Sequence, residues 1–174
     1  NNEKVNITFT GRILKDKGVR ELINAVELFP EKSKSKVRLN LYGKIDLENP
    51  AHITEKDLKK LLKPNFIVWH GHLQDIKNAL IESDIFCLPS YREGLPKSTL
   101  EAMAIGRPIV TTNAPGCRDV VRDKIDGLHF DRNDYKGAVN LIRSLIEDQN
   151  LYKKYREKSI KRGLFFDIKS IALQ

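Results

Sequence analysis

Cysteine is scarce in this sequence, and the spacings that mark metal or redox sites are missing. The 174 residues include two cysteines, Cys87 and Cys117, which form no CxxC pair. This usage argues against a disulfide framework and indicates two reduced thiols in a cytosolic protein. The four histidines follow no HExxH or related spacing, so the sequence predicts no metal site.

Long apolar runs are missing as well. No apolar segment approaches the roughly 20 residues that a transmembrane helix needs. The first six residues lack the apolar stretch of a signal peptide. The sequence starts without Met and stops within a segment of helical pattern, so we expect a fragment of a longer, cytoplasmic protein.

Acidic residues are fewer than basic ones, and the formal net charge is +8. A basic protein favours anionic partners, which include phosphates, nucleic acid and an acidic membrane face. The basic residues are spread along the chain, however, and local clusters such as 32–36 and 153–154 are typical of solvated surfaces. The charge alone therefore does not choose among these partners.

Short apolar segments alternate with amphipathic ones along the whole chain. The apolar segments predict strands at 5–10, 37–42, 66–69, 85–88, 109–112 and 127–130. The amphipathic segments predict helices at 18–29, 54–62, 73–82, 96–106, 134–146 and 151–162. Short strands without charge, each followed by a helix, indicate right-handed crossovers and a parallel sheet covered on both faces. We therefore expect one α/β domain, a Rossmann-like doubly wound sheet of about six strands.

Ligands of doubly wound sheets bind beyond the carboxyl ends of the strands, so the loops that follow strands are the candidate sites. The loop 11–18 follows the first strand and brings Arg12, Lys15 and Lys17 to the start of a helix. Cations and free amides at a helix N-terminus suit a diphosphate. The loop matches neither GxGxxG nor GxxxxGK[ST], which counts against dinucleotide oxidoreductases and phosphate-loop ATPases.

A second loop carries two carboxylates. Glu93 follows the fourth strand, and Glu101 lies about a turn into the next helix, across a turn at Gly94. Both carboxylates can face one crevice, where each could accept from vicinal sugar hydroxyls, and the amides of 95–98 form an anion seat. The helix dipole would by itself explain Glu101, but it does not explain the combination of loop, glycine and paired acids. A third loop, 111–120, is expected to form the far wall of the crevice.

The segment EGLPKSTLEAMAIGRPIVTTNAPGCRDVV, residues 93–121, resembles the donor-binding region of family-four retaining glycosyltransferases of the GT-B fold. The resemblance is carried by two glutamates separated by seven residues, a helix of small residues and a GxPV-like strand. The GRxxxxKG loop at 11–18, YGK at 42–44 and WHGH at 69–72 are also similar to that family. GLPKSTLEAMA is most similar to enzymes of bacterial surface polysaccharides and lipid-linked oligosaccharides.

The resemblance implies roles for particular residues. Arg12 and Lys17 would hold the donor diphosphate and stabilise charge on the leaving group. Glu93 would bind the transferred sugar near its reacting carbon, with the backbone of Gly94, Leu95, Pro96 and Lys97. Glu101 would bind the ribose hydroxyls.

The same resemblance places the base of the nucleotide near Gly71, His72 and Leu73, with Gly43 leaving room for it. These enzymes need no metal or cofactor, and the sequence contains no DxD motif. Two positions depart from the family pattern. Other members often have glycine at the position of Pro96 and glutamate at the position of Asp119.

The resemblance also implies that residues 1–174 form the donor domain, and that a separate N-terminal domain carries the acceptor site. Phe165, Phe166 and Ile168 would contact that missing element. Peripheral contact with an anionic membrane at the inner face is compatible with the basic charge, and no nucleic acid partner is expected.

The expected reaction is retaining transfer of a hexose or N-acetylhexosamine from a nucleoside diphosphate, with UDP favoured, to a sugar or lipid-linked acceptor. Two alternatives stay open. A non-catalytic nucleotide- or polyanion-binding module would bind regardless of the sugar and with strong salt dependence. A UDP-N-acetylglucosamine epimerase of similar architecture would need further acids and histidines in its cleft.

Overall fold

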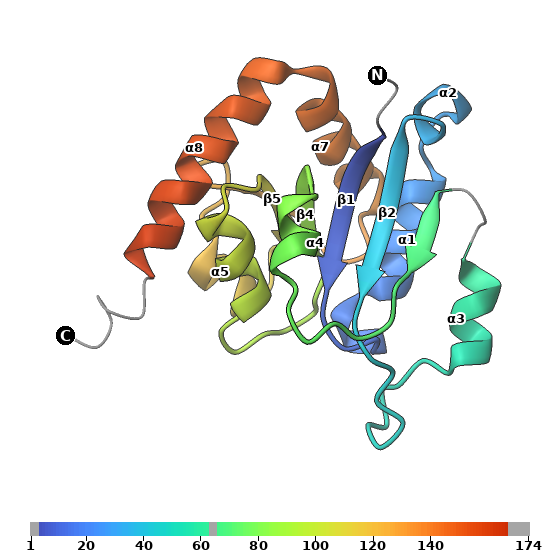
Figure 1. The fold of residues 1–174 in the computed structure, drawn as a ribbon. Helices are drawn as coiled ribbons and strands as arrows, with labels where there is room; N and C mark the ends of the chain where they lie inside the picture. The colour runs from blue at the N-terminus through green and yellow to red at the C-terminus, as the bar shows by residue number, and fades with distance from the viewer. Residues whose placement is uncertain (1–3, 63–65, 167–174) are drawn as a thin grey trace.

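The computed structural model describes residues 4–62 and 66–166. Its centre is a six-stranded sheet in the order β3-β2-β1-β4-β5-β6, with every neighbouring pair parallel. Figure 1 shows the strands with their carboxyl ends at the lower edge of the view. The strands are β1 Val5–Thr10, β2 Val37–Tyr42, β3 Ile67–Trp69, β4 Ile85–Leu88, β5 Ile109–Thr112 and β6 Leu128–Phe130.

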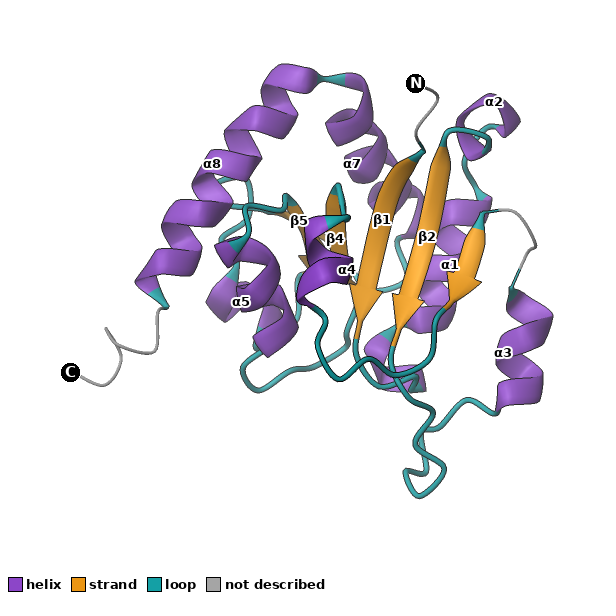
Figure 2. Ribbon diagram, viewed as in Figure 1, coloured by secondary structure: helices purple, strands orange, loops and turns teal. Residues whose placement is uncertain are grey.

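Helices lie on both faces of the sheet (Figure 2). α1 and α7 pack against each other on one face, while α4, α5 and α8 lie on the other, where α8 packs along α5. The helices are α1 Val19–Glu27, α2 Glu31–Lys34, α3 Glu55–Leu61, α4 Lys77–Ile81, α5 Lys97–Ala104, α6 Cys117–Val120, α7 Tyr135–Glu147 and α8 Gln149–Phe165, with a 3-10 turn η1 at Lys15–Lys17.

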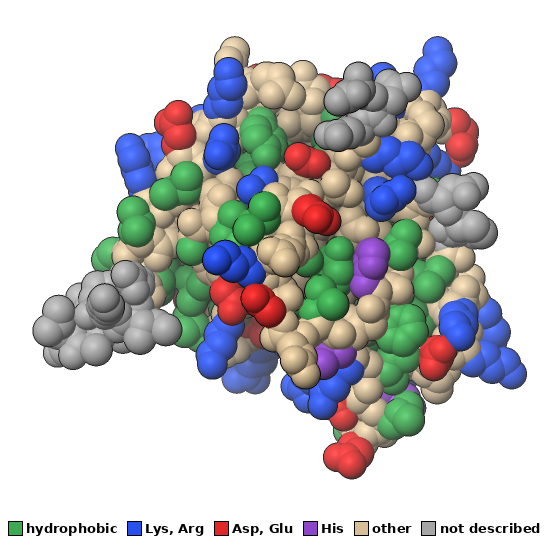
Figure 3. Space-filling view, viewed as in Figure 1, with side chains coloured by type: hydrophobic (Ala, Val, Ile, Leu, Met, Phe, Trp, Pro, Cys, Tyr) green, Lys and Arg blue, Asp and Glu red, His purple; other side chains and the backbone are tan. Residues whose placement is uncertain are grey.

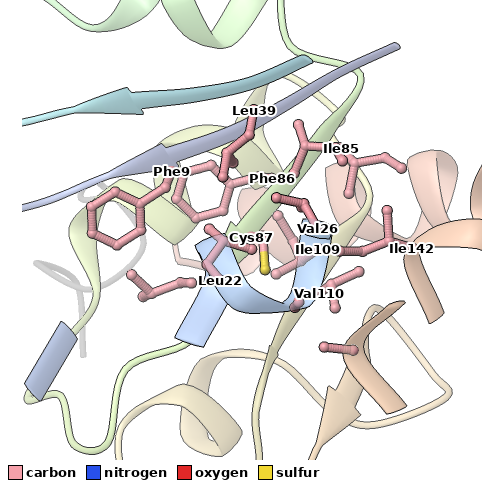
Figure 4. Packing of buried hydrophobic residues seen from close by; sticks show 14 of the residues in the cluster. Phe9, Leu22, Val26, Leu39, Ile85, Phe86, Cys87, Ile109, Val110 and Ile142 are labelled. Carbon is pink, nitrogen blue, oxygen red and sulfur yellow. The ribbon is translucent and has the colours of Figure 1, made fainter. Parts of the chain in front are cut away.

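The apolar strand residues explain why the sheet is central. β4 and β5 are buried along their whole length, as strands covered on both faces must be. Figure 4 shows Leu22 and Val26 of α1 packed into the same cluster as Phe86 and Ile109. Continuous burial of such side chains is the main favourable term for this sheet.

β2 departs from the expectation of strands without charge. Arg38 lies within β2 and is exposed, while Tyr42 at its end is half-buried. Figure 1 shows no helix in front of β2, so the expected cover on both faces is incomplete over this strand.

The helix expected at 73–82 is the main error in the sequence-based elements. α4 begins only at Lys77, whose amide donates to Asp75 Oδ1 at 2.8 Å. Residues 73–76 instead form part of the loop that follows Gly71, whose φ is +73°. The short elements η1, α2 and α6 were not predicted, because three or four residues carry too little apolar periodicity to identify a helix.

Both cysteines are free and buried, in agreement with the expectation of reduced thiols. No helix in the described ranges is long and apolar enough to cross a membrane. Of the three residues expected to contact a missing domain, Phe165 and Phe166 meet edge to face, while Ile168 lies outside the described residues.

Candidate functional site at the carboxyl edge of the sheet

A cavity of about 310 Å³ opens at the carboxyl ends of β1 and β2, beside the start of α5. Strand order reverses between β1 and β4, and this reversal is where doubly wound folds bind their ligands. The cavity is lined by residues from the ends of two strands, the three loops that follow β1, β2 and β3, and the helix α5: Thr10, Gly11, Arg12, Tyr42, Gly43, Lys44, His72, Leu73, Ile76, Lys97, Ser98 and Glu101.

The loops after β1 and β2 are joined through their backbones. Gly11 N donates to Tyr42 O, and Ile13 N donates to Lys44 O, both at 2.9 Å. A Cβ on Gly43 would lie 1.7 Å from Gly11 O, so only glycine allows this approach. Gly43 therefore sets the spacing of the two loops as well as lining the cavity.

Arg12 extends from the joined loops into the cavity rim. Its Nη1 donates to Asp46 Oδ2 at 2.9 Å, and half of the Arg12 side chain is exposed. Asp46 lies in the loop between β2 and α3, which projects beyond the strand ends in Figure 1. A guanidinium has five N–H donors, so this bond leaves Arg12 able to bind a second anion.

Lys17 and Glu93 form a more enclosed pair. Lys17 Nζ lies 2.7 Å from Glu93 Oε1, and the two side chains are only 16% and 13% exposed. The backbone around them is closely packed, because a Cβ on Gly18 would lie 2.1 Å from Pro89 O. Gly18 also has φ +68°, which favours glycine.

The loop after β5 contacts the backbone of Glu93. Glu93 N donates to Pro115 O at 3.0 Å, and a Cβ on Gly116 would lie 2.2 Å from Glu93 O. Asp119 Oδ2 accepts from Gly116 N at 2.9 Å. Residues 111–120 therefore brace the Glu93 loop and do not form the expected far wall, since none of them lines the cavity. Asp119, one of the two departures from the family pattern, thus accepts from the amide of Gly116 at the start of α6.

A buried thiol, Cys117, lies near enough to this pair for both charges to act on it. Burial raises the pKa of Cys117, and the carboxylate of Glu93 acts in the same direction. The thiol is therefore held protonated, a poor nucleophile, and it contributes packing to the site.

Glu101 lies at the open side of the cavity and is exposed. Partial desolvation of the carboxyl group raises the pKa of Glu101, Lys97 opposes the shift, and Asp75 adds to it. The two glutamates of the sequence-based site lie in different surroundings. Glu101 lines the cavity, whereas Glu93 is turned towards Lys17 and is absent from the lining.

An aromatic group flanks the cavity on the β2–β3 side. The rings of Tyr42 and His70 stack with their centroids 4.5 Å apart, and Trp69 Nε1 donates to Gly43 O at 2.9 Å. Burial lowers the pKa of His70, and its Nε2 lies 2.9 Å from Asn40 Oδ1. These contacts fix the position of Gly43 and of Tyr42, which lines the cavity.

The cavity divides the residues expected from the sequence into two groups. It brings together Arg12, Gly43, His72, Leu73, Lys97 and Glu101. It does not include Lys17, Gly71, Glu93, Gly94, Leu95 and Pro96 among its lining residues. Pro96 is buried as the N-cap of α5, and Gly94 has open space where a Cβ would point.

Several lining residues were not predicted. Lys44 adds a third cation beside Arg12 and Lys97, while Thr10 and Ser98 add hydroxyls. Lys44 could have been predicted from the sequence, because it lies two residues after the end of β2, and ligands bind at the carboxyl ends of such strands. Within the described ranges, no group of three or more His, Cys, Asp or Glu residues is placed to hold a metal ion.

Charged side chains of both signs are interspersed over the face shown in Figure 3. The face shown is therefore not dominated by side chains of one charge sign.

Comparison with known proteins decides the family. The model of the family described as "Glycosyl transferases group 1" matches residues 1–162. The chain belongs to the group 1 glycosyl transferases. This confirms the family expected from the paired glutamates and the GRxxxxKG loop.

Two curated relatives are each 31% identical to this group 1 chain. One is the capsular polysaccharide biosynthesis glycosyltransferase CapM of Staphylococcus aureus, over 161 residues that cover 92% of this chain and 42% of CapM. The other is the N,N'-diacetylbacillosaminyl-diphospho-undecaprenol alpha-1,3-N-acetylgalactosaminyltransferase of Campylobacter jejuni, over 166 residues that cover 95% of this chain and 42% of the relative. The chain thus spans less than half the length of these relatives, whose names agree with the expected polysaccharide and lipid-linked oligosaccharide group.

Solved structures confirm the fold. Anabaena HepE in complex with UDP superposes with a TM-score of 0.87 at 22% identity, covering 99% of this chain and 47% of HepE. The expected Rossmann-like doubly wound sheet, corresponding to one half of a GT-B glycosyltransferase, is therefore confirmed.

Proposed function

We propose that this chain is the donor-binding part of a glycosyltransferase that transfers a hexose or N-acetylhexosamine from a nucleoside diphosphate, with UDP the expected nucleotide. The observation that carries the proposal is the cavity at the strand reversal, which three cations, Arg12, Lys44 and Lys97, line together with the carboxylate of Glu101. Cations suit the diphosphate, and a carboxylate suits the vicinal hydroxyls of a ribose.

The enclosed pair would act next to the cavity. Lys17 would neutralise charge on the leaving diphosphate, and Glu93 would accept from hydroxyls of the transferred sugar, together with the backbone of 94–97. Both groups keep bonding capacity beside their mutual contact, because an ammonium has three N–H donors and a carboxylate has further acceptor positions. The proposed site uses no metal or cofactor, since its cations would perform the charge neutralisation.

The acceptor would bind elsewhere. We assign it to a second, N-terminal Rossmann-like domain, as residues 1–174 would supply only the donor half of the cleft. The acceptor would be a sugar or a lipid-linked sugar, and transfer would retain configuration. The membrane contact that a lipid-linked acceptor requires would then be peripheral.

Calorimetric titration of the chain tests this proposal. The ligands are UDP, GDP, ADP and UDP-sugars, and the variants are Arg12→Ala and Glu101→Ala. Arg143→Ala is the matched control, because Arg143 pairs with Glu147 on α7, away from the cavity. We expect saturable binding of one nucleotide, weakened about tenfold or more in both site variants and unchanged in the control.

The two alternatives predict different titrations. A polyanion-binding module would bind all nucleotides alike, lose affinity steeply with salt, and be insensitive to Glu101→Ala. An epimerase would convert the UDP-sugar without an acceptor, which chromatography of the sugar products would reveal. Transfer by this chain alone at the rate of a full-length relative would contradict the division into two halves.

A further inference from the structure

The helix α8 carries a row of lysines on the side that faces away from the protein. Lys153, Lys154, Lys158 and Lys161 are exposed, and their spacing places them on one face of the helix. Figure 3 shows Lys and Arg side chains along the edge that α8 occupies in Figure 1. Within the described residues, none of these four lysines forms an ion pair.

The opposite face of α8 fixes the helix against the protein without using these lysines. Tyr155, Ser159 and Gly163 are buried there. Ser159 Oγ donates to Arg107 O at 2.7 Å, and a Cβ on Gly163 would lie 2.9 Å from Ala104 N. α8 is thus held closely on α5, and folding does not require the lysines, since like charges at such spacings destabilise a helix.

The lysines of α3 show, by contrast, how a solvated helix balances its charge. Lys59 pairs with Glu55 at 2.6 Å, and Lys60 pairs with Asp57 at 3.1 Å. α8 lacks this balance, because it has four lysines and two arginines but only one acidic residue, Glu157. Four or more basic residues clustered on one helix are typical of a surface that binds anionic lipid.

Exposed apolar side chains lie at the end of the same face. Leu164 and Phe165 are 66% and 61% exposed, and they follow Lys161 by three and four positions, which places them beside the lysines. Nucleic acids and soluble polyanions offer phosphates without an apolar layer. A bilayer offers both, an anionic surface and an apolar interior beneath it. Lysines followed by leucine and phenylalanine therefore favour a bilayer as the partner.

We propose that this α8 face, formed by the four lysines, Leu164 and Phe165, docks on an anionic lipid bilayer. The lysines would lie at the headgroup phosphates, and the two apolar side chains would enter the layer below. The inference rests on the proposed function in one respect, since a lipid-linked acceptor would be held at a membrane. It goes further by assigning the contact to this chain, outside the nucleotide cavity, which none of these residues lines.

The experiment is co-sedimentation of the chain with phosphatidylcholine vesicles that either contain or lack phosphatidylglycerol. We expect binding only where phosphatidylglycerol is present, and weaker binding as salt rises. The triple variant Lys154→Gln, Lys158→Gln and Lys161→Gln should weaken that binding by about tenfold or more, because each lysine near an anionic surface contributes separately.

The helix α3 supplies the matched control. The triple variant Lys56→Gln, Lys59→Gln and Lys60→Gln removes the same number of charges from an exposed helix. We expect it to change vesicle binding by less than about twofold, because its lysines lie outside the α8 face. Thermal unfolding of both triple variants checks that the fold is kept.

Insertion of the apolar end has a readout of its own. Tryptophan emission of Leu164→Trp should shift to shorter wavelength when phosphatidylglycerol vesicles are added, after subtraction of the wild type, whose single tryptophan is Trp69. Leu28→Trp is the control, since Leu28 is 51% exposed at the end of α1 and should show no shift. An unshifted Leu164→Trp would overturn insertion of this end.

Three outcomes overturn the docking surface and leave the proposed function standing, because nucleotide titration does not depend on α8. One is a wild-type chain that ignores phosphatidylglycerol vesicles. Another is an equal loss in both triple variants, which would show that net charge alone drives binding. The third is a longer protein containing this chain whose vesicle binding the α8 variant leaves unchanged, since another domain would then cover Phe165 and the lysines. A chain that binds vesicles through α8 but binds no nucleotide would support the surface and overturn the proposed function.

Discussion

Two cation–carboxylate pairs lie at the same edge of the sheet, and the chain holds them in different ways. Lys17 and Glu93 are mostly enclosed, at 16% and 13% exposed, whereas Arg12 in the second pair is half exposed. Both pairs belong to loops that touch backbone to backbone through glycines, so the two pairs differ in the exposure of the cation. The open pair joins Arg12 to a carboxylate on a projecting loop.

The difference in exposure predicts different roles for the two pairs. Close backbone packing fixes the enclosed pair before any ligand arrives, which is the preorganisation that electrostatic catalysis requires. The open pair has one partner, Arg12, that is half exposed to solvent, where an ion pair contributes less and the guanidinium can exchange partners. We expect changes near the enclosed pair to affect folding, and changes near the open pair to affect binding.

Gly116→Ala should have the largest effect on stability. Its φ of +82° disfavours alanine, and the added Cβ would lie 2.2 Å from Glu93 O. We expect the free energy of unfolding to fall by about 2–4 kcal/mol, measured by urea denaturation. Gly94→Ala is the control, since its Cβ would meet open space, and it should be nearly neutral. Equal losses in both variants would show that the close approach of Gly116 to Glu93 O does not cause the loss.

Double-mutant cycles on the two pairs should give the next largest effect. Lys17→Met and Glu93→Gln should show a coupling free energy of about 1–3 kcal/mol, because each single change leaves a largely buried charge unpaired. Arg12→Met and Asp46→Asn should show about 0–1 kcal/mol. The measurement is urea denaturation at low and high salt, and only the open pair should lose its coupling as salt rises. Similar couplings for both pairs would contradict the comparison.

The sheet could be predicted from sequence, and the reason is its burial. β1, β2, β4 and β5 have the predicted bounds, because they are short segments rich in β-branched and aromatic residues and Leu, bounded by turn-forming or polar residues. The start of α4 could not be predicted in this way. Leu73 and Ile76 fit a helical face, but they line the cavity from a loop, and tertiary context overrides such a short pattern.

The site was predictable only in part, for a related reason. Residues that follow strands converge by topology, so Arg12 and Glu101 could be assigned to one edge without knowing any contact. Which carboxylate meets which cation depends on packing between loops distant in sequence. The Lys17–Glu93 contact, the role of Asp46 and the brace from residues 115–119 are of this kind.

Asp46→Asn tests whether the open pair competes with a ligand. The Asp46 carboxylate now occupies Arg12 Nη1, so removing its charge should free Arg12 for a diphosphate. We expect nucleoside diphosphate binding to tighten by about twofold to fivefold by calorimetry, with stability changed by less than about 0.5 kcal/mol. Glu48→Gln, an exposed acid in the same loop, is the control for general charge. Weaker binding in Asp46→Asn would instead show that Asp46 orients Arg12 for its ligand.

The smallest expected effect is the pH dependence contributed by Glu101 on the open side. Its pKa is raised above the ordinary value of 4.5 in the folded chain, through burial and Asp75, so the folded state binds this proton more tightly than the unfolded state. The contribution of Glu101 to stability is therefore greatest below that ordinary value and declines as pH rises through the raised pKa. Glu101→Gln should remove the decline, seen as a difference from the wild type in the free energy of unfolding between about pH 4 and about pH 7. Because Glu101 is exposed, solvent screens the effect, and we expect less than about 1 kcal/mol.

Asp75→Asn should reduce the decline without removing it. A wild type that gains stability over this range relative to Glu101→Gln would mean that the folded chain favours the ionised carboxylate, so that the open side, like the enclosed one, already supplies Glu101 with a partner.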